Sequence, residues 1–327
     1  MNPHTKQGLT SSKSASGTYP CYGMGVNLTS KKNIKELFKK HRVYPSKKFG
    51  QNFLIDKTII KKVIKAANLK PKDIVLEIGP GIGNLTQELA KKVKKVIAVE
   101  KDPKMIEILK ETLEDLKNVK IINKDILKLN FQFSIFNFQS IPNFQFSNKY
   151  KIIANLPFYI TAPVIRKFLE SKHPPIEMVL ITQKEVAQRI CSKPPKMNLL
   201  AVSVQFYAKV KTISYVSKKS FWPQPKVDGA ILKIKPLKNK SRGRASTFFK
   251  VVKAGFSQPR KQLANNLTKG LALSSPNGLA LRSSNGLKLN KEQIKFWLLK
   301  NNIQPSQRAE TLDIRDWINL TKSIKIK

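Results

Sequence analysis

Short apolar runs alternate with longer amphipathic stretches between residues 74 and 123, and this alternation limits the fold more than any other feature of the chain. The runs Ile74–Ile78, Val96–Glu100 and Val119–Asn123 are typical of strands buried on both faces. Helices are expected between them, at Leu85–Lys92 and Pro103–Leu116. Since a strand, a helix and a second strand form a βαβ unit, the sequence predicts a parallel sheet covered by helices.

The chain on either side extends this pattern. Asp56 is placed to cap a helix with apolar residues at helical spacing, namely Ile59, Ile60, Val63, Ile64 and Ala67. Further strands are predicted at Lys151–Ala154, Met178–Thr182, Val202–Val210 and Gly229–Ile234. Beyond Pro236 only helices are expected, at Thr247–Phe256, Pro259–Thr268, Lys291–Asn301 and Ile314–Lys322. The predicted fold class is therefore α/β, followed by a small all-α domain.

Composition divides the chain into three parts. Residues 1–30 are rich in Ser, Thr and Gly, which favours a disordered tail over a secretory signal and leaves Met24 as an alternative start. Residues 31–237 are assigned to the α/β domain and 238–327 to a helical domain that begins with a basic linker. A Phe-rich, uncharged segment at about 130–148 and a segment at about 270–289 with repeated Asn-Gly-Leu are interpreted as insertion loops.

The charge of the chain points to a polyanionic partner. Lys and Arg number 62 against 20 Asp and Glu, a formal charge of +42. Charge alone does not separate RNA from DNA or an anionic membrane, and a Lys-rich composition without a binding role is the alternative. Cys21 and Cys191 are isolated, which favours a reducing cytoplasm without disulfides or a metal site. No apolar run reaches the roughly 18 residues of a membrane span.

A glycine-rich turn, EIGPGIGN at residues 77–84, follows the first predicted strand. Glycines at a strand-to-helix turn adopt positive φ and let a ligand approach the backbone closely. The dinucleotide fingerprint G-x-G-x-x-G requires a third glycine where this chain has Asn84. The pattern E-x-G-x-G-x-G is instead that of class I methyltransferases, whose cofactor lacks phosphates. A tight turn without a ligand is the alternative.

Acidic residues follow the next two strands. Glu100 ends the second strand, 21 residues after Gly79, where a carboxylate can accept hydrogen bonds from both hydroxyls of a ribose. Asp125 follows the third strand and is placed to accept from an adenine amino group, although a helix N-cap is an equal alternative. Glu100 indicates a ribose without saying which cofactor carries it.

The sequence Asn155-Leu156-Pro157-Phe158 ends the strand after the Phe-rich segment. An adenine amino group is a poor nucleophile because its lone pair is delocalised into the ring. The side-chain carbonyl of Asn155 and the backbone carbonyl of Leu156 can accept its two hydrogens and localise that pair, while Pro157 stiffens the turn. Phe158 offers a flat apolar face on which an extruded base can stack.

These motifs together resemble the KsgA-type ribosomal RNA small-subunit adenine N6,N6-dimethyltransferases. The resemblance runs from about Lys31 to the C-terminus. It rests on FGQNFL (49–54), EIGPGIG (77–83), NLPF (155–158), FWPQPKVD (221–228), FSQPRK (256–261) and RAETL (308–312). It implies a Rossmann-like class I methyltransferase sheet of seven strands, followed by a helical domain that binds RNA.

The resemblance also implies an activity, a cofactor and a partner. The expected reaction is transfer of methyl groups from S-adenosylmethionine to two adjacent adenosines near the 3′ end of 16S rRNA, in a pre-ribosomal particle, by a monomeric cytoplasmic enzyme. Matching positions imply the cofactor contacts Asn52, Leu54, Gly79, Glu100, Asp125 and Asn155. RNA contacts are expected at Lys47, Lys48, Phe221, Arg260 and Lys261. No metal is implied.

Departures from the family pattern concern RNA binding more than chemistry. Phe158 stands where the family usually has Tyr, and Pro259-Arg260-Lys261 stands where it has Arg-Arg-Lys. Lys196–Leu199 replaces a frequent Tyr-Gly pair. Three alternatives stay open, in decreasing order of support. They are a macrolide-resistance type of large-subunit rRNA methyltransferase, a non-catalytic pre-ribosome binding factor, and an NAD oxidoreductase.

Overall fold

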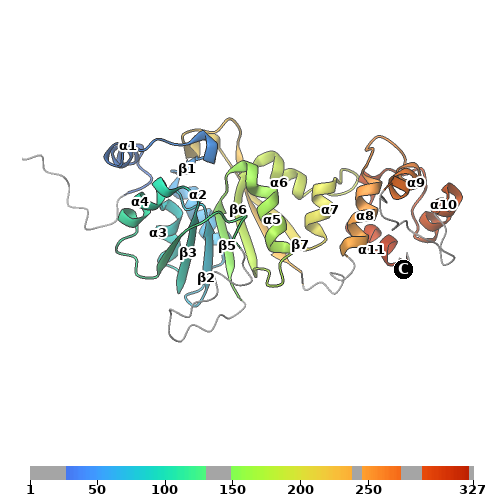
Figure 1. Cartoon of the computed structure of the whole chain (residues 1–327), viewed down its shortest axis with the longest axis horizontal. Coiled ribbons are helices and arrows are strands. Elements are labelled where there is room, and N and C mark those ends of the chain that lie inside the picture. Colours follow the sequence, from blue (N-terminus) through green and yellow to red (C-terminus); the bar gives the residue numbers. More distant parts are fainter. Residues whose placement is uncertain (1–26, 130–148, 238–244, 274–288, 324–327) are drawn as a thin grey trace, which may run out of the picture.

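The computed structural model describes residues 27–129, 149–237, 245–273 and 289–323. The expected N-terminal tail, both expected insertions and the basic linker therefore lie largely or wholly outside the described residues. Figure 1 shows an elongated molecule. One end contains a sheet flanked by helices, and the opposite end contains helices alone.

Seven strands form the central sheet, in the order β4-β3-β2-β5-β6-β9-β7. Their bounds are β2 (Ile74–Ile78), β3 (Lys95–Glu100), β4 (Val119–Asn123), β5 (Lys151–Asn155), β6 (Glu177–Gln183), β7 (Ala208–Val216) and β9 (Gly229–Pro236). Strands β2 to β6 are parallel, and β9 is antiparallel to both β6 and β7. This confirms the predicted parallel sheet for β2 to β6, while the antiparallel pairing of β9 makes the whole sheet mixed. Because the chain order reverses between β2 and β5, their carboxyl ends border a crevice in which ligands of such sheets bind.

Helices cover both faces of the sheet. Their bounds are α2 (Lys57–Ala67), α3 (Asn84–Ala90), α4 (Pro103–Thr112), α5 (Thr161–Leu169), α6 (Lys184–Ile190) and α7 (Leu199–Gln205), with the short turn η2 (Phe158–Ile160) before α5. Buried residues of α2 and α3 pack with Val75 on one face, and those of α5, α6 and α7 pack with Leu76 on the other. Asp56 caps α2 through its side chain, as predicted.

One predicted strand, Val202–Val210, is wrong. Residues Leu199–Gln205 form α7, and the strand begins only at Ala208. The Asn198 side chain accepts a hydrogen bond from the Ala201 N–H and so starts the helix. The alternation of Val202, Ser203 and Val204 imitates a strand, but packing of Val202 and Val204 against the sheet favours the helix.

An N-terminal segment crosses the carboxyl edge of the sheet. It comprises α1 (Lys31–Lys40), the turn η1 (Lys47–Phe49) and β1 (Phe53–Leu54), which pairs with β8 (Phe221–Trp222) after the turn η3 (Lys218–Ser220). Leu28 is buried in the same apolar cluster as α1. The expectation of disorder through residue 30 is therefore wrong for residues 27–30.

Among the described residues beyond 244, four helices and a short turn form the far end. They are α8 (Ala245–Gly255), α9 (Leu263–Leu273), α10 (Lys291–Lys300), η5 (Ala309–Thr311) and α11 (Ile314–Lys322). Helix α9 runs through Leu273, so residues 270–273 are helical where a loop was expected. The ring of Phe248 in α8 stacks on that of Phe206, which follows α7, with centroids 4.0 Å apart. The helical part thus shares one apolar core with the sheet, and we keep a domain boundary at residue 238 as a proposal.

Candidate active site

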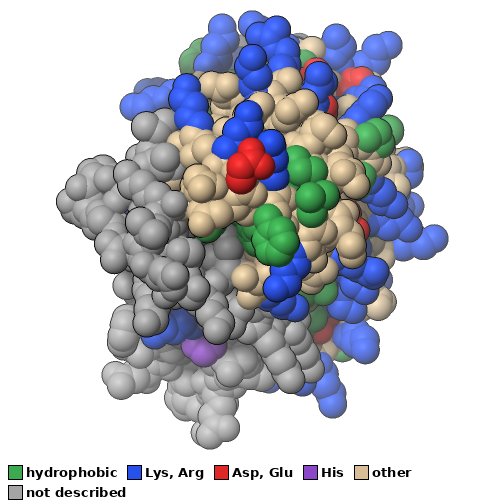
Figure 2. Space-filling model, turned by 90° about the vertical axis from the view of Figure 1, so that its right-hand side faces the viewer, with side chains coloured by type: hydrophobic (Ala, Val, Ile, Leu, Met, Phe, Trp, Pro, Cys, Tyr) green, Lys and Arg blue, Asp and Glu red, His purple; other side chains and the backbone are tan. Residues whose placement is uncertain are grey.

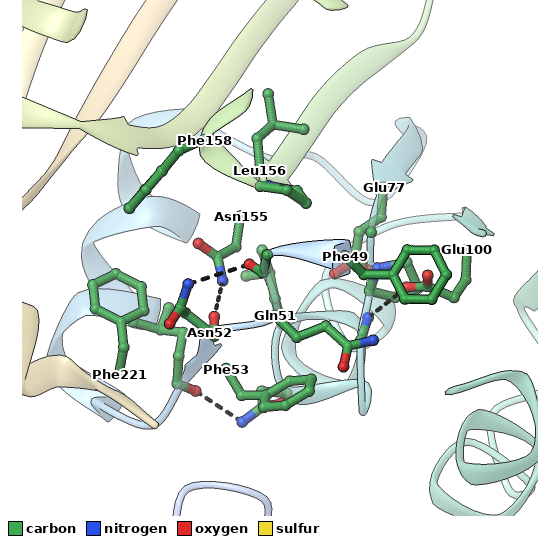
Figure 3. A pocket seen from close by; sticks show the side chains of 18 residues that line it. Phe49, Gln51, Asn52, Phe53, Glu77, Glu100, Asn155, Leu156, Phe158 and Phe221 are labelled. Carbon is green, nitrogen blue, oxygen red and sulfur yellow. Dashed lines mark hydrogen bonds between the residues drawn. The ribbon is translucent and has the colours of Figure 1, made fainter. Parts of the chain in front are cut away.

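A pocket lies at the carboxyl edge of β2, β3 and β5, under the segment 49–54 (Figure 3). The glycine turn after β2 forms its floor, and the residues 155–158 after β5 form its opposite wall. Sequence motifs from both ends of the α/β part, including Phe221 of β8, therefore meet in one place.

The glycine turn requires glycine for two different reasons. Gly79 and Gly81 have φ values of +68° and +62°, which L side chains rarely adopt. A Cβ atom on Gly81 would also lie 2.9 Å from Cε1 of Phe53 in β1. The turn thus lets β1 approach closely, and this contact closes the floor of the pocket.

Asn84 explains the missing third glycine of the dinucleotide fingerprint. It is the first residue of α3 and is 7 % exposed. Its Nδ2 donates to the backbone oxygens of Leu28, at 2.5 Å, and Leu54, at 2.8 Å. Asn84 therefore fastens the N-terminal segment over the pocket instead of making room for a pyrophosphate.

Glu100 lines the pocket, and its carboxylate is held by the backbone. Oε1 accepts from the N–H groups of Lys101, at 2.7 Å, and Asp102, at 2.9 Å, and Oε2 accepts from Gly81, at 3.2 Å. Burial raises the pKa of Glu100, and these hydrogen bonds oppose the rise. The turn and the carboxylate are thereby fixed relative to each other.

Asp125 follows β4 beside Glu100 but is not part of the pocket lining. Its Oδ2 lies 2.9 Å from Nζ of Lys101, and its Oδ1 accepts from the Leu127 N–H at 2.9 Å. Burial raises the pKa of Asp125, but Lys101 and the Leu127 N–H outweigh it and hold the pKa below its usual range. An adenine amino group at Asp125 would share the carboxylate with Lys101.

Asn155 has a defined orientation at the end of β5. Its Nδ2 donates to the backbone oxygen of Asn52 at 2.8 Å, so its carbonyl oxygen points away from Asn52 (Figure 3). Leu156 is buried and its N–H donates to Ile181, while the Ile160 N–H donates to Pro157. Phe158 lines the pocket and Tyr159 is exposed. The residues 155–158 thus line the same pocket as Asn52, Leu54, Gly79 and Glu100.

The segment 49–54 is held by more than Asn155. Gln51 Nε2 donates to Asp102 Oδ2 at 2.7 Å, and the Ser46 N–H donates to Gln51 Oε1 at 2.7 Å. Both Asn52 and Leu54, which the family resemblance implies as cofactor contacts, line the pocket. Sequence reasoning did not identify Gln51, because its role depends on Asp102, far away in the chain.

Sequence reasoning also missed Glu77, which lines the pocket from β2. It is 1 % exposed, and its Oε2 has no hydrogen-bond partner in the described part of the chain. Burial raises the pKa of Glu77 to about 8; the Thr86 hydroxyl lowers it and Glu100 raises it further. The signal was present in the sequence, since Glu77 is the acidic residue of an otherwise apolar strand.

The residues expected to contact RNA are not all together. Lys47 and Lys48 are exposed in η1, next to the pocket, whereas Phe221 is buried in β8 and faces the pocket. Arg260 and Lys261 are exposed between α8 and α9, at the other end of the molecule (Figure 1). Figure 2 shows that this end carries many Lys and Arg side chains and few acidic ones.

A groove of about 1130 Å³ runs between α5, α7 and α8. Its apolar surface includes Pro163, Tyr207 and Phe249. Five cations and one acid line it, namely Arg166, Lys167, Arg189, Lys250, Lys253 and Glu170. Along α5 the groove begins at Ala162, four residues after the 155–158 motif, and at α8 it reaches the helical end.

Two kinds of feature are absent from the described residues. None of their helices is both long and apolar enough to span a membrane. No group of three or more His, Cys, Asp or Glu side chains among them could hold a metal ion.

Comparison with known proteins gives consistent results. The family model for ribosomal RNA adenine dimethylase matches residues 44–324. Ribosomal RNA small subunit methyltransferase A of Dehalococcoides mccartyi (strain CBDB1) is 40% identical over 288 residues, 88% of this chain and 90% of the relative. The protein of that name from Clostridioides difficile (strain 630) is 37% identical over 304 residues, 92% of this chain and 98% of the relative.

Two solved structures share the fold. A dimethyladenosine transferase from Plasmodium falciparum superposes with a TM-score of 0.64 at 29% identity, covering 81% of this chain and 94% of that chain. The 23S rRNA methyltransferase ErmE superposes with a TM-score of 0.61 at 22% identity, covering 84% of this chain and 99% of that chain. At that identity ErmE shows the fold alone.

Proposed function

The chain belongs to the ribosomal RNA adenine dimethylase family, and on that premise we propose that it transfers methyl groups from S-adenosylmethionine to N6 of two adjacent adenosines near the 3′ end of small-subunit rRNA. Two relatives named ribosomal RNA small subunit methyltransferase A support this choice of subunit, at 40% and 37% identity over 90% and 98% of their length. Pre-ribosomal particles are the proposed setting, and the cytoplasm the proposed compartment.

The charge of the pocket is the observation that carries the choice of cofactor. In a chain of +42, two carboxyl groups line the pocket, those of Glu77 and Glu100, and no Lys, Arg or His does so among the described residues. A pyrophosphate would meet two acidic side chains there and find no cation. S-adenosylmethionine carries a positive sulfonium and no phosphate, so its charge fits this lining. When bound, it supplies the electrophilic methyl group.

Two carboxylates and three further residues would hold the cofactor at defined places. Glu100, fixed by three backbone N–H groups, would accept from the ribose hydroxyls. Asp125 would accept from the adenine amino group beside Lys101. Asn52, Leu54 and Gly79 complete the proposed contacts through the pocket lining.

The residues 155–158 would act on the target adenosine. The hydrogen bond from Asn155 Nδ2 to Asn52 leaves the Asn155 carbonyl oxygen as an acceptor for the target amino group. The Leu156 backbone oxygen is the proposed second acceptor. Together they would localise the nitrogen lone pair towards the methyl group, and Phe158 would stack on the base.

RNA would reach this site along the basic groove between α5, α7 and α8, with Lys47 and Lys48 beside the pocket. Phosphates would meet the five cations of the groove and bases its apolar surface.

The test is methylation of a defined substrate. Small ribosomal subunits from cells that lack this modification are incubated with the protein and S-adenosylmethionine, and primer extension is run on the 16S rRNA. We expect reverse transcriptase to stop at two adjacent adenosines near the 3′ end. A stop in large-subunit rRNA instead, or no stop at all with a protein that binds the subunits, would contradict the proposal.

A further inference from the structure

An exposed aromatic ring lies beside the pocket, directly after the residues 155–158. Tyr159 of η2 is 58 % exposed and is not part of the pocket lining, whereas Phe158 before it is. A 3₁₀ turn has about three residues per turn, so consecutive side chains point about 120° apart. The two rings therefore point in different directions, and they cannot stack on the same base.

The segment 49–54 packs against the Tyr159 ring. Gly50 lines the pocket and has a φ of +60°. A Cβ atom on Gly50 would lie 3.4 Å from Cε1 of Tyr159 and 3.3 Å from Cβ of Pro157. A glycine at this position thus lets the segment approach the ring closely. Tyr159 is thereby placed at the edge of the pocket, with more than half of its surface left open to solvent.

Lysine side chains lie close to this ring. Lys47 and Lys48 are exposed and stand three and two residues before Gly50, which contacts Tyr159. Asp125 raises the pKa of Lys101, and Tyr159 adds to the rise, so the Tyr159 hydroxyl lies near that ammonium group. An exposed aromatic ring with cations around it is suited to a single nucleic-acid strand, because bases stack on the ring and phosphates meet the cations.

The base that Tyr159 can bind is a neighbour of the target adenosine. Phe158 is the proposed stacking partner of the base inside the pocket, and a nucleotide joined to that one is the first that lies outside it. Enzymes that extrude a base gain selectivity from contacts with the nucleotides on either side. Tyr159 offers such a contact at the residue that follows Phe158.

A ring suits this neighbour better than a hydrogen-bonding group would. For one of the two adjacent adenosines the neighbour is the other adenosine, whose N6 gains methyl groups as the reaction proceeds. A contact that accepts a hydrogen bond from N6 is lost once that nitrogen carries two methyl groups. Stacking persists, because every base keeps a flat face whatever its substituents.

We propose that Tyr159 is a stacking platform for the nucleotide adjacent to the adenosine in the pocket. This rests on the proposed function, since it takes an adenosine in the pocket as given. Tyr159 would hold the strand beside the pocket while the target is extruded, and it would do so equally well before and after the neighbour is methylated.

Substitutions can separate the ring from its bulk and its hydroxyl. Tyr159→Phe keeps the ring, and Tyr159→Leu keeps apolar bulk against Gly50 without a ring. We expect Tyr159→Phe to methylate unmodified small subunits as wild type does, and Tyr159→Leu to lower kcat/KM by about 5- to 150-fold, the effect of losing one stacked base. Tyr215→Leu is the matched control, because Tyr215 of β7 is 52 % exposed and does not line the pocket.

Modified RNA identifies the base on which Tyr159 acts. Small subunits are reconstituted with 16S rRNA whose 3′ end is a ligated synthetic fragment. Each particle keeps a single target adenosine, with an abasic nucleotide on its 5′ side in one particle and on its 3′ side in the other. We expect the difference between wild type and Tyr159→Leu to disappear with one of these particles, because the base that stacks on Tyr159 is then missing from both reactions.

Calorimetry with S-adenosylmethionine in the absence of RNA serves as the check on folding, and Tyr159→Leu should bind it as wild type does. Weakened binding would assign the ring to the cofactor and overturn the proposal. So would wild-type kcat/KM for Tyr159→Leu, equal damage by Tyr159→Phe, or a difference that persists with both abasic particles. If wild type leaves unmodified small subunits without methyl groups, the proposed function is contradicted instead.

Discussion

At the scale of single residues, amide groups position this site more than charged groups do. Three amide side chains hold the segment 49–54 in place. Asn84 donates to Leu54, Asn155 donates to Asn52, and Gln51 of the segment donates to Asp102. An amide donates and accepts without changing charge, so these contacts persist over a wide pH range. Catalysis at Asn155 is therefore expected to depend on geometry rather than on titration.

Substitution of Asn155 should lower the rate of methyl transfer. We expect Asn155→Ala to slow methyl transfer by on the order of 10²-fold or more, as when one preorganised hydrogen-bonding group is lost, while RNA binding persists. Single-turnover assays on assembly-stage small subunits measure the rate, and binding of S-adenosylmethionine is measured alongside because the contact to Asn52 is lost too. A wild-type rate for Asn155→Ala would exclude the proposed role.

Phe158 provides a separable prediction. Phe158→Ala should weaken capture of the target base by about 1–3 kcal/mol, the usual contribution of stacking on an aromatic ring. Phe158→Tyr keeps the ring and should be nearly neutral. The same assay at varied subunit concentration checks both variants. If Tyr is as damaging as Ala, stacking is not what Phe158 contributes.

Glu77 also predicts how the stability of the ligand-free protein depends on pH. Its pKa is about 8 when folded and near its usual 4.5 when unfolded, so between these values the native state holds a proton that the unfolded chain has lost. The contribution of Glu77 to the free energy of unfolding then falls by up to about 1.4 kcal/mol per pH unit as pH rises from 4.5 to 8. Denaturant unfolding of wild type and Glu77→Gln should differ by this slope; parallel curves would argue against the shift.

A site residue could be predicted from the sequence when its position depends on its own strand, and not when it depends on a distant segment of the chain. Glu100 and Asn155 were predictable because each ends a strand, and the carboxyl ends of parallel strands share an edge. Glu77 is visible in the sequence as the one acidic residue of an apolar strand, but its burial is not, and neither is the contact of Gln51 with Asp102, because both arise only when distant segments fold together.

At the scale of elements, short segments held by side chains determine the shape of the pocket. The strand β1 has only two residues and pairs with an equally short β8. The helix α7, also short, was mistaken for a strand because its Val residues alternate with Ser203. For such elements tertiary contacts outweigh local propensity, whereas β2 and α2 were predictable from their own pattern.

Substitution of Asn84 tests whether its side chain holds β1 and residues 27–30 in place. Asn84→Gly removes two hydrogen bonds and should lower the free energy of unfolding by about 1–3 kcal/mol. Hydrogen exchange should rise at residues 27–30 and 53–54. Asn118→Ala is a matched control, since Asn118 also donates to two backbone oxygens, those of Ala90 and Val93, away from this segment. Unchanged exchange at residues 27–30 in Asn84→Gly would show that β1 is held by other contacts.

At the scale of the whole molecule, the charge of +42 should make RNA binding steeply dependent on salt. If roughly six phosphates are contacted, the slope of log K against log salt is about −5 on a duplex. Replacing Lys250 and Lys253 in the groove with Gln should reduce the magnitude of this slope by about 2. Lys91 and Lys110, which pair with Glu88 and Glu107, provide the control double variant. A slope near zero would mean that the Lys-rich composition has no role in binding RNA.

The stacked rings of Phe206 and Phe248 bear on how such an enzyme selects its target. Because α8 to α11 share a core with the sheet, the far helices cannot swing freely on a hinge. The distance between the pocket and the basic end is then fixed. If the proposed RNA contacts at both ends are made, only a particle whose target adenosines lie at that distance from a second contact site can bind both ends at once. Recognition becomes a measurement of distance on a folded particle, and a short oligonucleotide with the right sequence should be a poor substrate.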